Sequence, residues 1–359
     1  MAAAIVHVTH ESTTPGQRET ILALVAASKQ VGPQIVARAA GPAPWLVDVD
    51  ARGRRRVALA DLADGDTIVH YWCAPAALAR RRVGFDNRAC AAILLDVDSA
   101  LSIRAHFPVT VAGIVVDSER ARAAAVGHGA APGDIAVIRP WVDYARIRRD
   151  DRARVRAQLG LTDGDRAALL LPPLCPELGT YESSWAALVV ERVRPELKII
   201  APGGYPEASR LERLADAVDR TRSLLVASET LELPELLVAS DVALLAPPAD
   251  CPHRPIAWAL AAGCPIVATA THATCELLAH EVNARLCREC APRFIARRLL
   301  EALEAPDAGR NLVAHGRRQA YALFSRQRMI EQYARVYENA RAGRTLADGI
   351  IDPLHQTTH

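Results

Sequence analysis

The sequence predicts an α/β protein built from two Rossmann-like, doubly wound parallel-sheet domains. Its 359 residues exceed what one hydrophobic core usually supports. Short apolar runs alternate with amphipathic helical stretches, which is typical of a parallel sheet covered by helices. This alternation restarts after a highly charged segment, residues 146–156. Ligands of such sheets bind at the carboxyl ends of the strands, so we expect a cleft between two facing domains to hold the site.

The predicted organisation is an N-terminal domain over residues 1–145 and a C-terminal domain over 146–325, followed by a helix that crosses back, with a frayed tail, over 326–359. The first domain is expected to contain strands at 2–10, 33–40, 66–72, 91–98, 112–118 and 135–141, and helices at 16–32 and 117–129. In the second, strands are expected at 166–173, 197–204, 223–228, 241–248, 264–270 and 284–287. Helices are expected at 181–193, 206–219, 233–240, 254–262, 274–281, 291–304 and 311–341.

Composition excludes several classes of function. With 43 basic and 41 acidic residues the formal charge is only +2, so no nucleic-acid partner is expected. No signal peptide and no run of 18 apolar residues are visible, and eight cysteines suit reduced core residues, so we expect a cytoplasmic protein. One CxxC, Cys287 with Cys290, lacks a second pair, so no metal is expected.

Five segments, in order along the chain, resemble the family 4 (group 1) glycosyltransferases. The C-terminal domain carries most of them, in the segments LKIIAPGGYPEASRLERLA, ELPELLVASDVALLAP and AWALAAGCPIVAT. VVDSERARAAAVGHGAAPGDIAVIRPWVD resembles the interdomain passage of this family, and RRQAYALFSRQRMIEQYARVYENA resembles its closing helices. The resemblance implies the GT-B fold and a nucleotide-diphosphate sugar as the substrate, with no separate cofactor.

The resemblance also places candidate residues around the donor. Helix 254–262 would point its N-terminus at the diphosphate, with Pro255 as its first residue. Arg254 would either bind phosphate or simply be solvated. Asp250 corresponds to the first of two family acids, near the donor sugar, and is the catalytic candidate. Trp258 stands at the second acid, where it would stack on a base or fill the pocket.

Further donor-site positions come from the turns that follow strands. Gly203 and Gly204 match the family's glycine turn, Glu276 matches its acid after the last glycine pair, and Gly16 matches its N-terminal glycine loop. The two family cations that clamp the diphosphate are absent, because Pro172, Pro173 and Leu178 stand at those positions. Arg139, Arg254 or a metal would have to compensate.

The first domain offers a smaller set of candidates. His70 lies in a strand that matches a family motif and is the second catalytic candidate, although a core role is the alternative. Asp96 and Asp98 would position an acceptor hydroxyl or, preferably, cap a helix. Two basic runs would either touch an anionic membrane at its inner face or be solvated; they are Arg54, Arg55, Arg56, Arg80, Arg81 and Arg82.

Two functions remain open. The first is a glycosyltransferase of the hexosyltransferase type, which passes a sugar from a nucleotide donor to a glycan or lipid-linked acceptor in polysaccharide biosynthesis, with retention. The second is a catalytically degenerate GT-B protein that binds a glycan, a nucleotide or a partner transferase. Asp250 and Glu276 favour the first, whereas Pro173, Leu178 and Trp258 favour the second.

Overall fold

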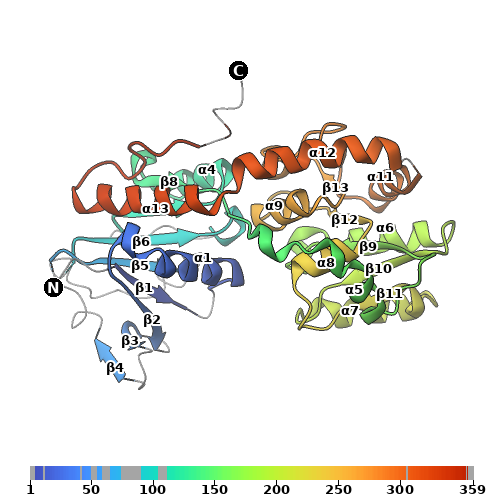
Figure 1. Ribbon diagram of the computed structural model, residues 1–359, viewed down its shortest axis with the longest axis horizontal. Coiled ribbons are helices and arrows are strands. Elements are labelled where there is room, and N and C mark those ends of the chain that lie inside the picture. Colours follow the sequence, from blue (N-terminus) through green and yellow to red (C-terminus); the bar gives the residue numbers. More distant parts are fainter. Residues whose placement is uncertain are drawn as a thin grey trace. The chain divides into compact units, whose positions relative to one another are not determined.

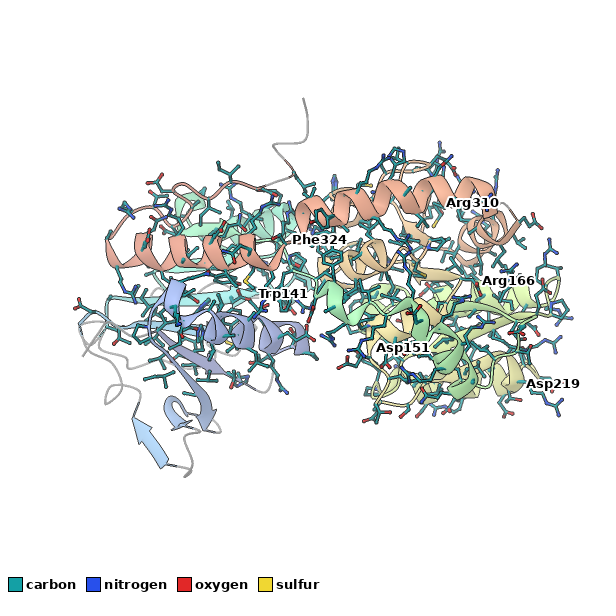
Figure 2. The ribbon with its side chains drawn as sticks, in the orientation of Figure 1. Trp141, Asp151, Arg166, Asp219, Arg310 and Phe324 are labelled. Carbon is teal, nitrogen blue, oxygen red and sulfur yellow. The ribbon has the colours of Figure 1, made fainter. Side chains whose placement is uncertain are left out.

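The computed structural model describes residues 5–10, 13–40, 43–49, 55–58, 65–73, 90–103, 111–304, 306–352 and 354. The chain forms two compact units, Met1–Trp141 with Phe324–His359, and Val142–Leu323. Trp141 and Phe324 mark where the chain leaves and re-enters the first unit, and both are buried (Figure 2).

The first unit is built on an eight-stranded sheet. The strands follow the order β4-β3-β2-β1-β5-β6-β7-β8, with bounds β1 Ile5–Thr9, β2 Gln34–Ala40, β3 Ala43–Val49, β4 Arg55–Ala58, β5 Ile68–Trp72, β6 Ala92–Val97, β7 Gly113–Val116 and β8 Ile135–Val137. Six of them, β1, β2 and β5 to β8, are parallel, which confirms the doubly wound sheet. Strands β3 and β4, which the sequence pattern did not predict, extend the sheet in antiparallel fashion.

Helices cover both faces of this sheet: α1 Pro15–Ala26, α2 Ser28–Val31, α4 Glu119–Gly127 and α13 Arg326–Arg341. One apolar core joins the sheet to α4, and a second joins it to α1 and α13. Figure 1 shows α13, in red, lying along the sheet. The last helix is therefore an integral part of the first unit.

The segment 342–352 after α13 is anchored to the first unit, whereas the sequence predicts a frayed tail. Leu346 is buried, and its amide donates to the carbonyl of Gly133 at 3.1 Å. The Asn339 amide donates to the carbonyls of Leu346 (3.1 Å) and Asp348 (2.8 Å). Asp352 is also buried. Local sequence patterns do not predict these bonds, because the bonds are made to backbone atoms or to residues far away in the chain.

The second unit contains six parallel strands in the order β11-β10-β9-β12-β13-β14. Their bounds are β9 Arg166–Leu170, β10 Leu197–Ala201, β11 Leu224–Val226, β12 Val242–Leu245, β13 Ile266–Thr269 and β14 Arg285–Cys287. The four residues of β12 and of β13 are all buried, as expected for a sheet covered on both faces.

The helices of this unit are α5 Arg152–Gln158, α6 Thr180–Glu191, α7 Glu207–Ala217, α8 Leu233–Ala239, α9 His253–Ala262, α10 His272–Cys275, α11 Pro292–Glu304 and α12 Pro306–Leu323. Helices α6, α7 and α11 pack on one core of the sheet. Figure 1 shows α12 running beside α9, and the Arg317 guanidinium donates to the carbonyl of Ala262 at 3.1 Å. In the part of the chain that the structure describes, no helix is long and apolar enough to cross a membrane.

The charged segment, residues 146–156, which includes most of α5, is fastened to the second unit by Asp241. The Arg152 guanidinium lies 2.8 Å from Asp241, and the carboxylate also accepts from the backbone amide of Ala167 at 2.8 Å. Arg152 and Arg156 additionally donate to carbonyls at the end of α8. Cations at a helix C-terminus are stabilised by the exposed carbonyls there. The arginines therefore anchor the start of the unit.

Candidate functional site

The carboxyl edge of the second sheet has a topological switch point. Strand order reverses between β9 and β12, the two strands from which the sheet grows in opposite directions. The loops that follow β9 and β12 therefore diverge at this edge, which is where ligands bind in open parallel sheets. Candidate residues from both loops meet here.

The loop after β9 is closely packed. Gly179, which precedes α6, has φ of 65°, and a Cβ built on it would lie 1.9 Å from the carbonyl oxygen of Ala246, just beyond β12. Only glycine fits this approach of two backbones. Leu178 is 2% exposed and contributes to packing at the position where the resemblance implies a lysine. Pro172 and Pro173 are joined by a cis peptide bond.

Helix α9 follows the loop after β12. The helix begins at His253, one residue earlier than predicted, with Pro252 as its N-cap. Pro255 is consequently the third residue and not the first. Of the four N-terminal positions whose amides have no intrahelical partner, two are prolines without N–H groups. His253 and Arg254 are therefore the two positions of this helix end that carry a backbone N–H group.

His253 links α9 to the next helix. The ring is fully buried, and Nε2 donates to the carbonyl of Ala273 in α10 at 2.8 Å. This bond requires the tautomer that carries the proton on Nε2. His253 thus fixes the position of the α9 N-terminus relative to α10.

Three charged candidates belong to α9 and to the segments on either side of it. Asp250 lies in the loop between β12 and α9, Arg254 is the second residue of α9, and Glu276 directly follows α10. All three are half-buried, and each already interacts with other groups of the protein. Their assignment to a donor stays a prediction.

Trp258 is covered by protein. The ring is 3% exposed, and the Arg146 guanidinium lies over it at 5.3 Å from the ring centroid. Arg146 is held in turn by the Glu232 carboxylate at 2.8 Å. Of the two alternatives for Trp258, this geometry favours filling of the pocket over stacking on a base.

The glycine turn after β10 is required by the backbone. A Cβ on Gly203 would lie 2.3 Å from the carbonyl oxygen of Ala227, and Gly204 has φ of 80°. A side chain at Gly203 would separate this turn from the segment after β11, so the turn has a packing role whether or not it meets a ligand.

Two candidates of the first unit are placed differently from the prediction. His70 lies in the middle of β5, fully buried, and Nδ1 shares a 2.9 Å hydrogen bond with the Tyr337 hydroxyl of α13. Burial, and then the neighbouring His7, hold the pKa of His70 well below its usual value. A neutral ring beneath a helix is a core residue, not a group near a strand end that reaches substrate.

Arg139 is the second candidate that the structure places differently from the prediction. Its guanidinium is buried and forms an ion pair of 2.5 Å with Asp352, with further bonds from Nε to both carboxylate oxygens at 3.2 Å. The charge of Arg139 is therefore matched within the first unit. It does not compensate for the missing diphosphate cations.

Gly16 lies in the first turn of α1, and its ligand role stays a prediction. Thr14 caps this helix, because its hydroxyl accepts from the Gln17 amide at 3.2 Å. The membrane prediction falls largely outside the described residues, which do not include Arg54, Arg80, Arg81 or Arg82. The backbone at Arg55 and Arg56 belongs to β4.

A buried polar network in the first unit was missed. Asp96 accepts from the Tyr333 hydroxyl at 2.5 Å and from the Gln17 side chain at 3.0 Å, so it neither caps a helix nor faces solvent. Burial raises the pKa of Asp96 to about 7, against the lowering effect of these two hydrogen bonds. The available signal was the pair Tyr333 and Tyr337, four residues apart and thus on one face of a helix.

Asp98 lies two residues beyond Asp96 and is only half-buried. The Ser102 hydroxyl donates to it at 3.5 Å, at a short helical turn over Ala100–Ser102. Among the described residues, no group of three or more His, Cys, Asp or Glu side chains is arranged to hold a metal ion.

Comparison with known proteins agrees with this architecture. Residues 182–305 match the family model described as "Glycosyl transferases group 1". A curated relative, N-acetyl-alpha-D-glucosaminyl L-malate synthase of Bacillus anthracis, is 19% identical over 206 residues, which are 57% of this chain and 53% of the relative. The match thus spans about half the length of that relative.

Solved structures match nearly the whole chain. A glycosyltransferase from Rickettsia africae has a TM-score of 0.72 at 12% identity, covering 94% of this chain and 98% of its own. Anabaena HepE with UDP-glucose has 0.73 at 15% identity (94% and 100%). Sucrose-phosphate synthase of Thermosynechococcus elongatus has 0.70 at 15% identity (95% and 100%).

The chain therefore has the GT-B fold, and the resemblance to group 1 glycosyltransferases is confirmed. The segment that matches the family model runs from α6 to the end of α11 and includes α9 and the loops beside it.

Proposed function

We propose that this chain is a glycosyltransferase that moves a sugar from a nucleoside-diphosphate donor to a glycan or lipid-linked acceptor, with retention of configuration. The observation that carries the proposal is the N-terminus of α9. It begins at the switch point of a parallel sheet, within the segment that matches the group 1 glycosyltransferase model. Helix N-termini at such points bind phosphate.

The chemistry requires a stabilised leaving group. As the bond from the sugar to the diphosphate breaks, negative charge grows on the diphosphate, and positive charge develops on the sugar ring. In the proposed site the amides of His253 and Arg254 and the Arg254 side chain stabilise the diphosphate. Asp250 faces the sugar, and Glu276 contacts the donor. The structure of Anabaena HepE contains UDP-glucose, so uridine nucleotides are the first donors to test.

The proposal extends to the setting of the enzyme. All eight cysteines are free, which is in keeping with a reducing, cytoplasmic compartment. An acceptor anchored in a membrane would bring the enzyme to its inner face. Polysaccharide assembly is the class of process that combines such donors and acceptors.

Two buried side chains favour a second candidate, a GT-B protein that binds without catalysis. Leu178 and Trp258 are 2% and 3% exposed at positions where the family carries charge. Each cation that stabilises a leaving group contributes a factor of about 10²–10³ in rate. By the resemblance, this site lacks two such cations, at Pro172–Pro173 and at Leu178.

Donor turnover separates the two candidates. Purified protein is incubated with UDP-glucose, UDP-N-acetylglucosamine and GDP-mannose, and release of nucleoside diphosphate is measured. Catalysis predicts release that Asp250→Ala lowers about 100-fold, whereas the exposed Arg148→Ala leaves it unchanged. No release with any donor, from protein shown to be folded, contradicts the proposal and favours a binding module.

A further inference from the structure

The end of the loop before α1 and the first turn of this helix, residues 13–17, are tied to the first sheet at two points. At the first, the Thr13 hydroxyl donates to the carbonyl of Trp72 at 2.5 Å and accepts from the His10 amide at 2.7 Å. At the second, the Gln17 side chain donates to Asp96, at 3.0 Å both to the backbone carbonyl and to Oδ1. The same Gln17 side chain accepts from the Thr14 amide at 3.1 Å and so closes the capping box of α1.

The carboxylate that holds Gln17 is itself held by the C-terminal helix. Asp96 is 6% exposed, and its second oxygen, Oδ2, accepts from the Tyr333 hydroxyl at 2.5 Å. Tyr333 belongs to α13 and is 4% exposed. A continuous hydrogen-bonded path therefore runs from Tyr333 through Asp96 and Gln17 to the Thr14 amide.

A second tyrosine of α13, Tyr337, makes a hydrogen bond that does not lead to the first turn of α1. One turn further along α13, the Tyr337 hydroxyl bonds to His70 Nδ1 at 2.9 Å. His7 continues the aromatic cluster by accepting from Trp72 Nε1 at 3.0 Å. No bond of this second path reaches Gln17 among the described contacts. Two tyrosines of one helix, both buried and both bonded, thus differ in whether they lead to the loop.

We propose that Tyr333 and Asp96 are positioning residues that hold residues 13–17, which are the end of the loop before α1 and the first turn of that helix, in place through the C-terminal helix. This turn includes Gly16, which the resemblance places beside the donor diphosphate. The consequence for ligand binding rests on the proposed function, whereas the positioning itself does not.

The physical basis is the cost of an unpaired buried carboxylate oxygen. Without the Tyr333 hydroxyl, Asp96 Oδ2 loses its donor in a buried site, and a buried polar atom without a partner is strongly disfavoured. The carboxyl group then turns or takes up a proton, and either change weakens its two-point grip on the Gln17 amide group. The capping box at Thr14 depends on the same side chain, so the first turn of α1 loosens with it.

Hydrogen exchange followed by mass spectrometry tests the positioning directly. Tyr333→Phe removes one hydroxyl and retains the ring, and Tyr337→Phe is the matched control. We expect amides at residues 14–20 to exchange about fivefold faster or more in Tyr333→Phe. In Tyr337→Phe they should exchange as in the wild type. Asp96→Asn in otherwise wild-type protein should keep most of the protection, because its amide oxygen can accept from Gln17 and its amide nitrogen can donate to the Tyr333 hydroxyl.

Equal exchange of the loop in the two tyrosine variants would overturn the proposal. So would an increase in Tyr333→Phe that affects β5 and β6 as much as the loop, because that is general destabilisation. Calorimetry with UDP adds the ligand arm, in which Tyr333→Phe but not Tyr337→Phe should weaken binding. If wild-type protein binds no nucleotide, the proposed function fails, and the exchange result still decides whether Tyr333 positions the loop.

Discussion

Arg146 covers the ring of Trp258 and is anchored by Glu232 on its other side. The segment that starts the second unit is therefore in contact with α9, the helix that carries the donor candidate Arg254. The resemblance places Trp258 where the family has an acid. The cation of Arg146 lies over the Trp258 ring. The contact of half-buried Arg146 with buried Trp258 makes this part of α9 a packed surface and not an open pocket.

Loss of the Arg146 side chain should destabilise the second unit modestly. We expect Arg146→Ala to lower the free energy of unfolding by about 0.5–1 kcal/mol, because it removes a cation–π contact at a partly exposed site. Urea denaturation measures this, with Arg148→Ala, an exposed neighbour, as the control. Equal stabilities for the two variants would show that the Arg146 contact contributes nothing.

The pair of Arg139 and Asp352 should be essential to the first unit. Asp352→Ala leaves a buried guanidinium without its carboxylate, which costs about 3–5 kcal/mol. The exposed Asp348→Ala serves as the control and should be nearly neutral. The midpoint of thermal unfolding provides the measurement. If the two variants melt together, Asp352 does not neutralise Arg139 in solution.

The stability of the first unit should depend on pH, with Asp96 and the two buried histidines contributing in opposite directions. The pKa of Asp96 is raised to about 7 by burial, so its contribution to stability is present below pH 4 and lost as pH rises through 7. The pKa of His7 is lowered to about 4 by burial, and that of His70 is lowered as well. The two histidines therefore contribute stability above pH 6.5 that is lost as pH falls towards 4.

Asp96→Asn isolates the first contribution. Its unfolding free energy should improve relative to the wild type as pH rises from about 5 to 8, by at most about 1.4 kcal/mol per pH unit. Denaturation series at several pH values provide the comparison. Asp66→Asn, an exposed site, should show a constant difference. A constant difference for Asp96→Asn as well would mean that Asp96 titrates normally.

The sequence predicts the second unit better than the first. Its buried parallel strands are continuous apolar runs, such as the one that becomes β12, and they stand out between amphipathic helices. In contrast, β4 begins within a run of arginines, and β3 contains Pro44, so neither fits the strand pattern. The role of the charged segment at the start of the second unit was not predicted either, because Arg152 pairs with Asp241, which lies far away in the chain.

The roles of single residues were harder to predict because their partners lie far away in the chain. Arg139 bonds Asp352, 213 positions away, and Asp96 bonds Tyr333, 237 positions away. Local patterns carry no record of such pairs. Strand register, which placed His70 under α13, likewise depends on tertiary packing.

The most direct test of the account is calorimetric titration with UDP, GDP and ADP. We predict that the wild type binds at least one of them and that Arg254→Ala weakens this binding at least about tenfold, the loss of one charge-assisted contact. Arg148→Ala should bind as the wild type does. Absence of binding to all three nucleotides, in protein whose unfolding transition is intact, would contradict a nucleoside-diphosphate site at the N-terminus of α9.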